Sequence, residues 1–150
     1  MFSTECISLG EYMELNFEQL QEQDIVQLRG ISDEFSDIDI KNVKPFLAEK
    51  QNIALVAKLD DKIIGLLFGY SLTDFDGGTT QFYIYSVDIH TEYQGRGYGS
   101  QFVRFAVEWA KDNGFRMCSI YADEDNKRAS RVYEKAGMSV GKANEFSVVF

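Results

Sequence analysis

A glycine-rich turn is the feature of this sequence with the clearest capacity for chemistry. Residues 94–99, Gln-Gly-Arg-Gly-Tyr-Gly, separate a run rich in β-branched and aromatic residues from an amphipathic stretch, which predicts a strand-to-helix connection. Such a turn directs backbone N–H groups toward one point at the positive end of the helix dipole, where phosphate oxygens bind. The glycine spacing fits neither a dinucleotide fold nor a P-loop, so NAD and ATP are disfavoured as ligands.

Side chains that hold metals or act as nucleophiles are scarce. The two cysteines, Cys6 and Cys118, lie far apart and form neither a metal-ligand spacing nor a redox pair, so we expect two buried structural thiols. His90 is the single histidine, which excludes a histidine-rich zinc site and leaves one imidazole for any Ser-His-Asp or Cys-His machinery. We therefore expect no metal and disfavour a hydrolase.

The charge is unevenly distributed along the chain. The formal net charge of −9 argues against a nucleic acid as partner, because binding to its phosphates needs a basic face. Residues 1–95 hold 17 acidic and 6 basic residues, a net charge of −11, whereas residues 96–135 hold 6 acidic and 8 basic residues, a net charge of +2. The sign changes where the glycines cluster, which the general need for a soluble surface does not explain.

The chain is long enough for one core and too short for two. Its longest apolar stretch, Ile63–Tyr70, is far shorter than the roughly 18–20 residues needed to cross a bilayer. The start, Met1–Glu5, has no basic region and no cleavable apolar segment. We expect a single domain over residues 1–150, with no membrane partner and a cytoplasmic location.

Hydrophobic periodicity and turn residues predict the elements that position the turn. We expect a strand between about residues 5 and 15, a helix from Glu18 to Phe35 and a short helix around Ile40 to Lys50. The remaining expected elements are three antiparallel strands at 52–58, 62–72 and 80–89, a helix at 99–113, a strand at 115–122, a helix at 126–135 and a strand at 146–150. Asp60 and Asp61 form the turn between the first two of those strands.

Two motifs in this order resemble those of the GCN5-related N-acetyltransferase (GNAT) family. Gln94, Gly97 and Gly99 match its acyl-CoA loop, Q/R-x-x-G-x-G/A. Residues 126–138 resemble its N-x-x-A-x-x-x-Y-x-K-x-G-hydrophobic helix, and the order of expected elements is similar too. The resemblance implies an α/β (α+β) fold with a central mixed, mostly antiparallel sheet flanked by helices. It also implies an enzyme that moves an acetyl group from acetyl-CoA to an amine.

The resemblance implies a site for CoA. Its pyrophosphate would be held by backbone N–H groups of the turn, namely Gln94, Gly95, Arg96, Gly97, Tyr98, Gly99 and Ser100. Its pantetheine arm would pair with the strand from Val87 to Ile89, which in the family splays away from the next strand at a bulge. Asn126 would contact the pantetheine arm, cap its own helix, or do both. Arg96 could offset phosphate charge, whereas Lys127, Arg128 and Arg131 are each expected to be solvated helix charges.

Acetyl transfer needs a neutral amine, a polarised carbonyl and a proton for the departing thiolate. By resemblance Tyr133 is the general acid, and its reference pKa of about 10 keeps it protonated at neutral pH. A backbone N–H near Ile89 would polarise the carbonyl. The general base is expected among the acids nearest the turn, Asp88 or Glu92, while His90 is expected to pack or to cap locally.

The acceptor is expected to be a small molecule that bears amines. Within the family, residues 82–90 and 121–125 look most like the aminoglycoside 3-N-acetyltransferases, although Ser86 replaces the strand aspartate of that subgroup. Acidic residues that would flank the acceptor cleft and attract a polycation are Glu34, Asp37, Asp39, Asp123, Glu124 and Asp125. The alternatives are a protein or peptide N-acetyltransferase and a non-enzymatic acyl-CoA-binding module. A homodimer is a possible oligomeric state.

Overall fold

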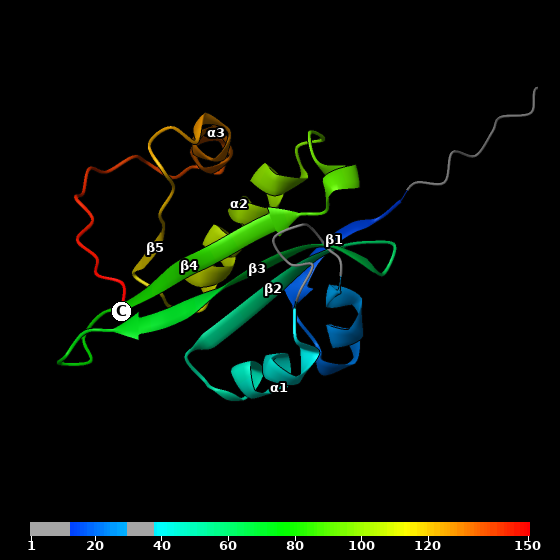
Figure 1. Ribbon diagram of the computed structural model, residues 1–150, viewed down its shortest axis with the longest axis horizontal. Coiled ribbons are helices and arrows are strands. Elements are labelled where there is room, and N and C mark those ends of the chain that lie inside the picture. The colour runs from blue at the N-terminus through cyan, green and yellow to red at the C-terminus, as the bar shows by residue number, and fades with distance from the viewer. Residues whose placement is uncertain (1–12, 30–37) are drawn as a thin grey trace, which may run out of the picture.

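The computed structural model describes residues 13–29 and 38–150. Its centre is a five-stranded sheet in the order β1-β2-β3-β4-β5 (Figure 1). The strands are β1 Leu15–Gln19, β2 Asn52–Leu59, β3 Lys62–Thr73, β4 Thr80–Ile89 and β5 Met117–Ile120. Neighbouring strands are antiparallel except for β4 and β5, which are parallel. The expected mixed, mostly antiparallel sheet is therefore confirmed.

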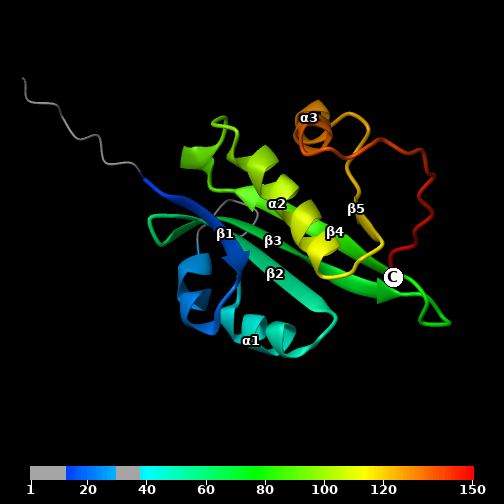
Figure 2. The same ribbon diagram turned by 180° about the vertical axis from the view of Figure 1, so that it is seen from behind.

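Helices cover both faces of the sheet. The 3₁₀ helix η1, Glu22–Leu28, and α1, Ile40–Ala48, lie on one face, while α2, Tyr98–Asp112, and α3, Lys127–Lys135, lie on the other side (Figures 1 and 2). Alternate residues of each strand point to opposite faces, so the sheet separates two apolar clusters. Phe82 and Ile84 of β4 pack with Phe102 of α2 in the larger cluster, and Leu66 of β3 packs toward η1 and α1 in the smaller one.

Two irregularities in β4 prepare an opening in the sheet. The pairing of β3 with β4 passes from Phe68–Ser86 to Gly69–Ile84 and so skips Tyr85, which is a β-bulge. Gly69 is required there, because a Cβ at this position would lie 2.1 Å from the Tyr83 carbonyl oxygen. On its other side β4 pairs with β5 only as far as Ile84. From Tyr85 onward no strand of the described part of the chain pairs with the outer edge of β4, as the family resemblance implied.

Several expected boundaries are confirmed. The strand at 80–89 has the expected limits, and α1, α2 and α3 lie within a residue or two of theirs. Asp60 and Asp61 form the β2–β3 turn with φ values of 47° and 66°, the left-handed conformation that a tight hairpin needs. The shorter β5, Met117–Ile120, replaces the expected strand at 115–122.

Other expectations are wrong at the two ends of the chain. The first described strand is Leu15–Gln19, so residues expected to begin a helix at Glu18 are extended. The next segment, which contains Ile25 and Leu28, forms a seven-residue 3₁₀ helix. Apolar residues three apart fit one face of a 3₁₀ helix as well as one face of an α-helix. Residues 5–12 and 30–35 of those two expected elements lie outside the described part of the chain.

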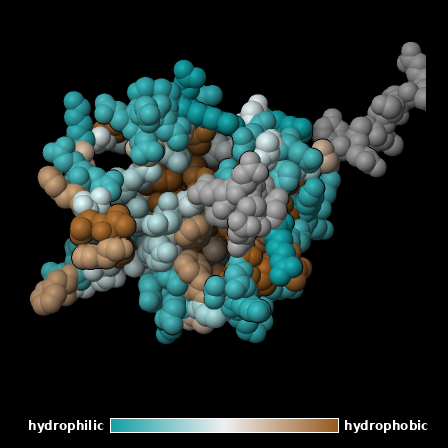
Figure 3. All heavy atoms as spheres, in the orientation of Figure 1, coloured by the Kyte–Doolittle hydropathy of each residue, from teal (hydrophilic) through white to brown (hydrophobic). Residues whose placement is uncertain are grey.

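The expected last strand at 146–150 is absent from the structure. Its apolar residues are exposed instead, with Val149 at 95% and Phe150 at 110% of full exposure. Figure 3 shows hydrophobic residues at the end where the β3–β4 turn and the C-terminus lie in Figure 1, and others in the middle of this face and over η1. Apolar β-branched composition favours a strand but does not make one unless the main chain also pairs with a neighbouring strand. Within the described ranges, no helix is both long enough and apolar enough to span a bilayer.

Candidate active site

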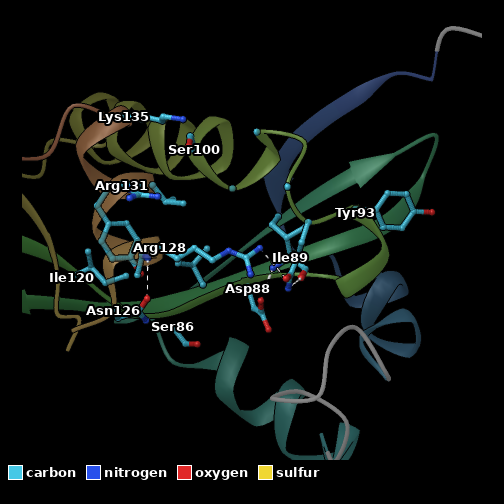
Figure 4. A pocket seen from close by; sticks show the side chains of 18 of the residues that line it. Ser86, Asp88, Ile89, Tyr93, Ser100, Ile120, Asn126, Arg128, Arg131 and Lys135 are labelled. Atoms are coloured by element: carbon cyan, nitrogen blue, oxygen red, sulfur yellow. Dashed lines mark hydrogen bonds between the residues drawn. The ribbon is translucent and has the colours of Figure 1, made fainter. Parts of the chain in front are cut away.

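A cavity of about 580 Å³ opens where β4 and β5 part. Its walls come from the outer edge of β4, the turn that follows it, the N-terminus of α2, the end of β5 and the inner side of α3 (Figure 4). The cavity thus brings together segments far apart in the sequence, including both motifs predicted to bind acyl-CoA. The predicted residues that line it are Val87, Asp88, Ile89, Gln94, Gly95, Gly97, Gly99, Ser100, Asn126 and Tyr133.

The glycine turn presents main chain to the cavity. Gly95 and Gly97 have φ values of 76° and 81°, in the left-handed region that favours glycine. Gly97 is the N-cap of α2, and no side chain in the described part of the protein caps this helix end. The first N–H groups of a fifteen-residue helix therefore face the cavity without intrahelical partners. This is an anion-binding arrangement.

Two of the predicted CoA-binding residues in this turn contribute no side chain to the cavity. The Arg96 guanidinium donates to the Glu92 carbonyl oxygen at 3.1 Å and lies 5.5 Å from the centre of the Tyr93 ring. Tyr98 packs its ring against the core beneath α2. Sequence reasoning places both residues in the right turn, but it does not show which way each side chain points. Only their backbone N–H groups remain candidates for phosphate binding.

The outer edge of β4 offers main-chain groups to a ligand. The N–H of His90 donates to the Ile64 carbonyl at 2.7 Å, so the antiparallel ladder turns the main-chain groups of Val87 and Ile89 away from β3 and toward the cavity. Asp88 accepts the N–H of Ile89 at 2.8 Å. The Ile89 N–H, expected to polarise the thioester, thus donates to the carboxylate that is expected to act as base. The Val87 N–H, on the same outer edge of β4, is an alternative donor.

Gln94 connects three walls of the cavity. Its side-chain amide donates to the Ile89 carbonyl at 2.7 Å and accepts from the Arg128 guanidinium at 2.9 Å. Arg128 is exposed, as expected for a solvated charge, yet it also lines the cavity together with Arg131. The sequence interpretation did not expect this, although the position of both arginines on the motif-bearing helix was a usable signal. The glutamine of the loop motif therefore has a structural role in joining β4 to α3.

The helix α3 begins at the predicted asparagine. The Asn126 side chain accepts the N–H of Ala129 at 3.0 Å, so it is an N-cap and also lines the cavity. The helix is held against α2 by Arg104, which donates to the Lys135 carbonyl at 2.6 Å. Tyr133, half-buried, faces the cavity from one turn further along α3 than Ala129. Both expected roles of Asn126 are thus geometrically compatible.

The walls of the cavity differ in charge. Arg128, Arg131 and Lys135 come from the α3 side, whereas Asp88 is the one acidic residue among the described residues that line the cavity. Ser86 and Asp88 point away from α3, toward the side of β4 on which α1 lies (Figure 4). The cavity therefore has a cationic compartment beside the glycine turn and an acidic group at the opposite mouth.

Of the remaining acids predicted to bind the acceptor, those that the structure describes are not in the cavity wall. Glu34 and Asp37 lie outside the described residues. Asp39 caps α1, accepting the N–H of Lys41 at 3.0 Å. Asp123, Glu124 and Asp125 are exposed on the turn that leads into α3, between the wall residues Tyr121 and Asn126. Their part in acceptor binding remains a prediction.

Two other predictions concern His90 and the two cysteines. His90 caps a short 3₁₀ turn, η2 Thr91–Tyr93, by accepting the N–H of Glu92 at 3.2 Å, so the expected local role is confirmed. Cys118 is half-buried against the core, and its burial raises the pKa of the thiol from 9.0 to about 11. A thiol that stays protonated is a poor nucleophile, which agrees with a structural role. Cys6 lies outside the described residues.

Comparisons with known proteins identify the family and the fold. A mycothiol acetyltransferase from Corynebacterium glutamicum is 34% identical over 61 residues, which are 41% of this chain and 21% of that protein. The match thus spans about a fifth of that curated relative. An aminoglycoside acetyltransferase from an uncultured soil metagenomic sample, solved with sisomicin, has a TM-score of 0.78 at 23% identity, covering 91% of this chain and 96% of its own.

The aminoglycoside N-acetyltransferase AAC(6')-Iy, solved in complex with CoA, has a TM-score of 0.77 at 14% identity, covering 91% of this chain and 95% of its own. Likenesses at this level of identity concern the fold. Family membership is shown by a match to a family sequence model, because this match extends from β1 to the end of the second motif. The model of the acetyltransferase (GNAT) family matches residues 15–138, and the chain belongs to that family.

Proposed function

We propose that this protein is an acetyl-CoA-dependent N-acetyltransferase that transfers the acetyl group directly to a small-molecule amine. The observation that carries the proposal is a cavity lined by the open N-terminus of α2 and by Tyr133, with the Asp88 side chain on the opposite side of β4. One end suits an anionic cofactor and the other suits a cationic acceptor. Family membership and the relatives named above support the same activity.

The residues present fit CoA. Its pyrophosphate meets the backbone N–H groups at the start of α2, where Gly95 and Gly97 leave the main chain uncovered. Its other anionic groups meet Arg128, Arg131 and Lys135, which offset the repulsion expected from a chain of net charge −9. The amide groups of its pantetheine arm have the outer edge of β4 at Val87 as a pairing partner.

The chemistry needs no covalent enzyme intermediate. The neutral amine attacks the thioester carbonyl carbon, a C–N bond forms, and the C–S bond breaks as the tetrahedral intermediate collapses. Tyr133 donates its hydroxyl proton to the departing thiolate sulfur. The proton lost from the amine nitrogen passes to Asp88, directly or through water, and an N–H facing the cavity from β4 stabilises the oxyanion.

The acceptor proposed from the sequence is a small polycation such as an aminoglycoside, and the sequence pattern looks most like the aminoglycoside 3-N-acetyltransferases. The fold neighbours solved with sisomicin and with CoA are aminoglycoside acetyltransferases, which supports the broader class, but one of them is of the 6'-type. The Asp123–Asp125 run near the cavity mouth supports a cationic acceptor through long-range attraction. The 3-amino position has no support beyond the sequence pattern.

A thiol-release assay tests the activity. Acetyl-CoA is incubated with the protein and a panel of aminoglycosides, linear polyamines and lysine-containing peptides, and free thiol is followed with the amine varied. We expect release that depends on a small-molecule amine and falls at least tenfold in Asp88→Asn. Release with peptides alone would instead favour a protein N-acetyltransferase, and release independent of any amine would contradict the proposal.

A further inference from the structure

Aromatic rings form a connected network on the face of the sheet that carries α1. Phe46 of α1 contacts Phe68 and Tyr70 of β3 at ring-centre distances of 5.9 and 6.0 Å. Tyr85 contacts Phe68 at 5.5 Å and Tyr70 at 5.9 Å. Tyr83 lies between the rings of Tyr85 and Tyr121, at ring-centre distances of 6.2 and 5.6 Å. Tyr121 directly follows β5. The network thus reaches from a core-facing helix to the end of β5.

The outer members of this network stand in the cavity wall. Tyr85 and Tyr121 both line the cavity, and they are 60% and 72% exposed. Tyr85 is the bulged residue of β4, so its ring is both turned outward and fixed by contacts with three other rings. Exposed aromatic side chains that are held rigidly provide contact area at small entropic cost, a property of binding surfaces.

The rings lie on the acceptor side of the chemistry. Ser86 pairs across the strands with Phe68, and Asp88 pairs with Leu66, so both side chains project on the same sheet face as the aromatic network. Figure 4 shows Ser86 and Asp88 on the side of β4 away from Arg128 and Arg131. A molecule that places an amine next to Asp88 therefore occupies the sheet face that carries the tyrosines.

The chemistry of this wall favours ring stacking over multiple ion pairs. Within the described lining, Asp88 supplies one negative charge for an ammonium group, while three cationic side chains occupy the other compartment. Burial, with the neighbouring phenols and Glu145, raises the pKa of Tyr83 above its ordinary value of 10.0, so its ring stays neutral at physiological pH. Neutral aromatic faces attract the C–H edges of rings and nearby cations.

We propose that Tyr85 and Tyr121 form a stacking platform for the acceptor, and that the acceptor is a primary amine carried on a ring. The proposal rests on the proposed function, whose acceptor class it narrows. The ring stacks on the tyrosines while its amine reaches Asp88. Sugar-ring amines and aromatic-ring amines share this chemistry, whereas linear polyamines lack it even where their charge is higher.

Steady-state acetylation kinetics test the platform with four amines: sisomicin and phenethylamine, which carry rings, and spermidine and hexylamine, which do not. We expect Tyr85→Ala to lower kcat/KM for both ring amines by about 2- to 12-fold, mainly through KM, and to change hexylamine by less than about twofold. Tyr85→Phe keeps the ring and should recover most of the loss. Phe75→Ala is the matched control, since Phe75 is fully exposed on the β3–β4 turn.

Sisomicin represents the sugar-ring amines and phenethylamine the aromatic-ring amines. Only sisomicin is a polycation, so the pair also separates ring stacking from charge. Equal losses for ring and linear amines in Tyr85→Ala, or a wild-type preference for spermidine, would overturn the platform. If no amine is acetylated, calorimetric titration of the same amines into the CoA-saturated protein decides. Ring-selective binding that Tyr85→Ala weakens would sustain the platform and reject the proposed activity, whereas absence of ring-selective binding would overturn the platform itself.

Discussion

Replacing Gly97 by valine separates backbone strain from ligand binding. Gly97 and Gly77 have φ values of 81° and 75°, and a Cβ at either position is uncrowded: the nearest atom is Gln101 Nε2 at 3.9 Å for Gly97, and none lies within 4 Å for Gly77. A left-handed valine therefore costs roughly 1–3 kcal/mol at either site. At about 2–4 °C per kcal/mol, each variant should melt about 2–12 °C below the wild type.

The response to CoA should distinguish the two variants. At a CoA concentration about 100 times its Kd, the ligand stabilises the wild type by about 2.7 kcal/mol, or roughly 5–11 °C. Gly77→Val should keep this shift because no residue of the β3–β4 turn lines the cavity. Gly97→Val should lose it because the side chain blocks access to the N–H groups of α2.

Differential scanning fluorimetry with and without millimolar CoA measures both effects. A wild type whose melting temperature CoA does not change would refute the reasoning about the glycine turn. The same conclusion would follow if Gly97→Val retained the full shift. A loss of the shift in Gly77→Val as well would mean that general destabilisation, rather than blocked access, explains the result.

Three further predictions concern single residues. Tyr133→Phe should keep the fold and the CoA shift but lower turnover by about 10²–10⁴-fold, and turnover above half of the wild-type value would reject Tyr133 as proton donor. Lys58→Met should lower the free energy of unfolding in urea by about 3 kcal/mol, because Asp24, paired with Lys58 at 2.5 Å, is buried; a loss below about 1 kcal/mol would contradict this. The Cys118 thiol, whose pKa burial raises to about 11, should react slowly with iodoacetamide at pH 8 in the native protein. An alkylation rate in the native protein equal to the rate in urea would refute the raised pKa. The thiol ionises at lower pH in the unfolded chain than in the folded protein, so the free energy of unfolding should fall as pH rises from about 9 toward 11.

The central part of the fold was predictable because local signals there agree. The alternation and β-branching of Thr80–Ile89, the apolar face of α2 and the paired aspartates of the β2–β3 turn each indicate the conformation that the structure has. The chain ends were not predictable in this way. Glu18 is extended because β1 pairs with β2. Residues 146–150 have a strand-like composition but form no strand in the structure.

The site was predictable in its main chain and less so in its side chains. Motif spacing identified the glycine turn and Tyr133, but sequence gives no direction for a long side chain such as Arg96, which lies on Tyr93. The charge distribution predicted an acceptor site with several acidic residues, yet Asp88 is the one acidic residue among the described residues that line the cavity. The tyrosine network was missed because its rings come from separate strands, and only the register of β3 with β4 brings them together.

Carbon-13 NMR of acetyl-CoA labelled at the acetyl carbonyl tests the central claim most directly. When the labelled acetyl-CoA is incubated with the protein and an accepted amine, the thioester carbonyl signal should be replaced, one for one, by the signal of an amide carbonyl on the amine. The conversion should slow by the same factor in Tyr133→Phe as in thiol release. A thioester signal that persists despite CoA binding, or that passes into free acetate, would contradict direct acetyl transfer to an amine.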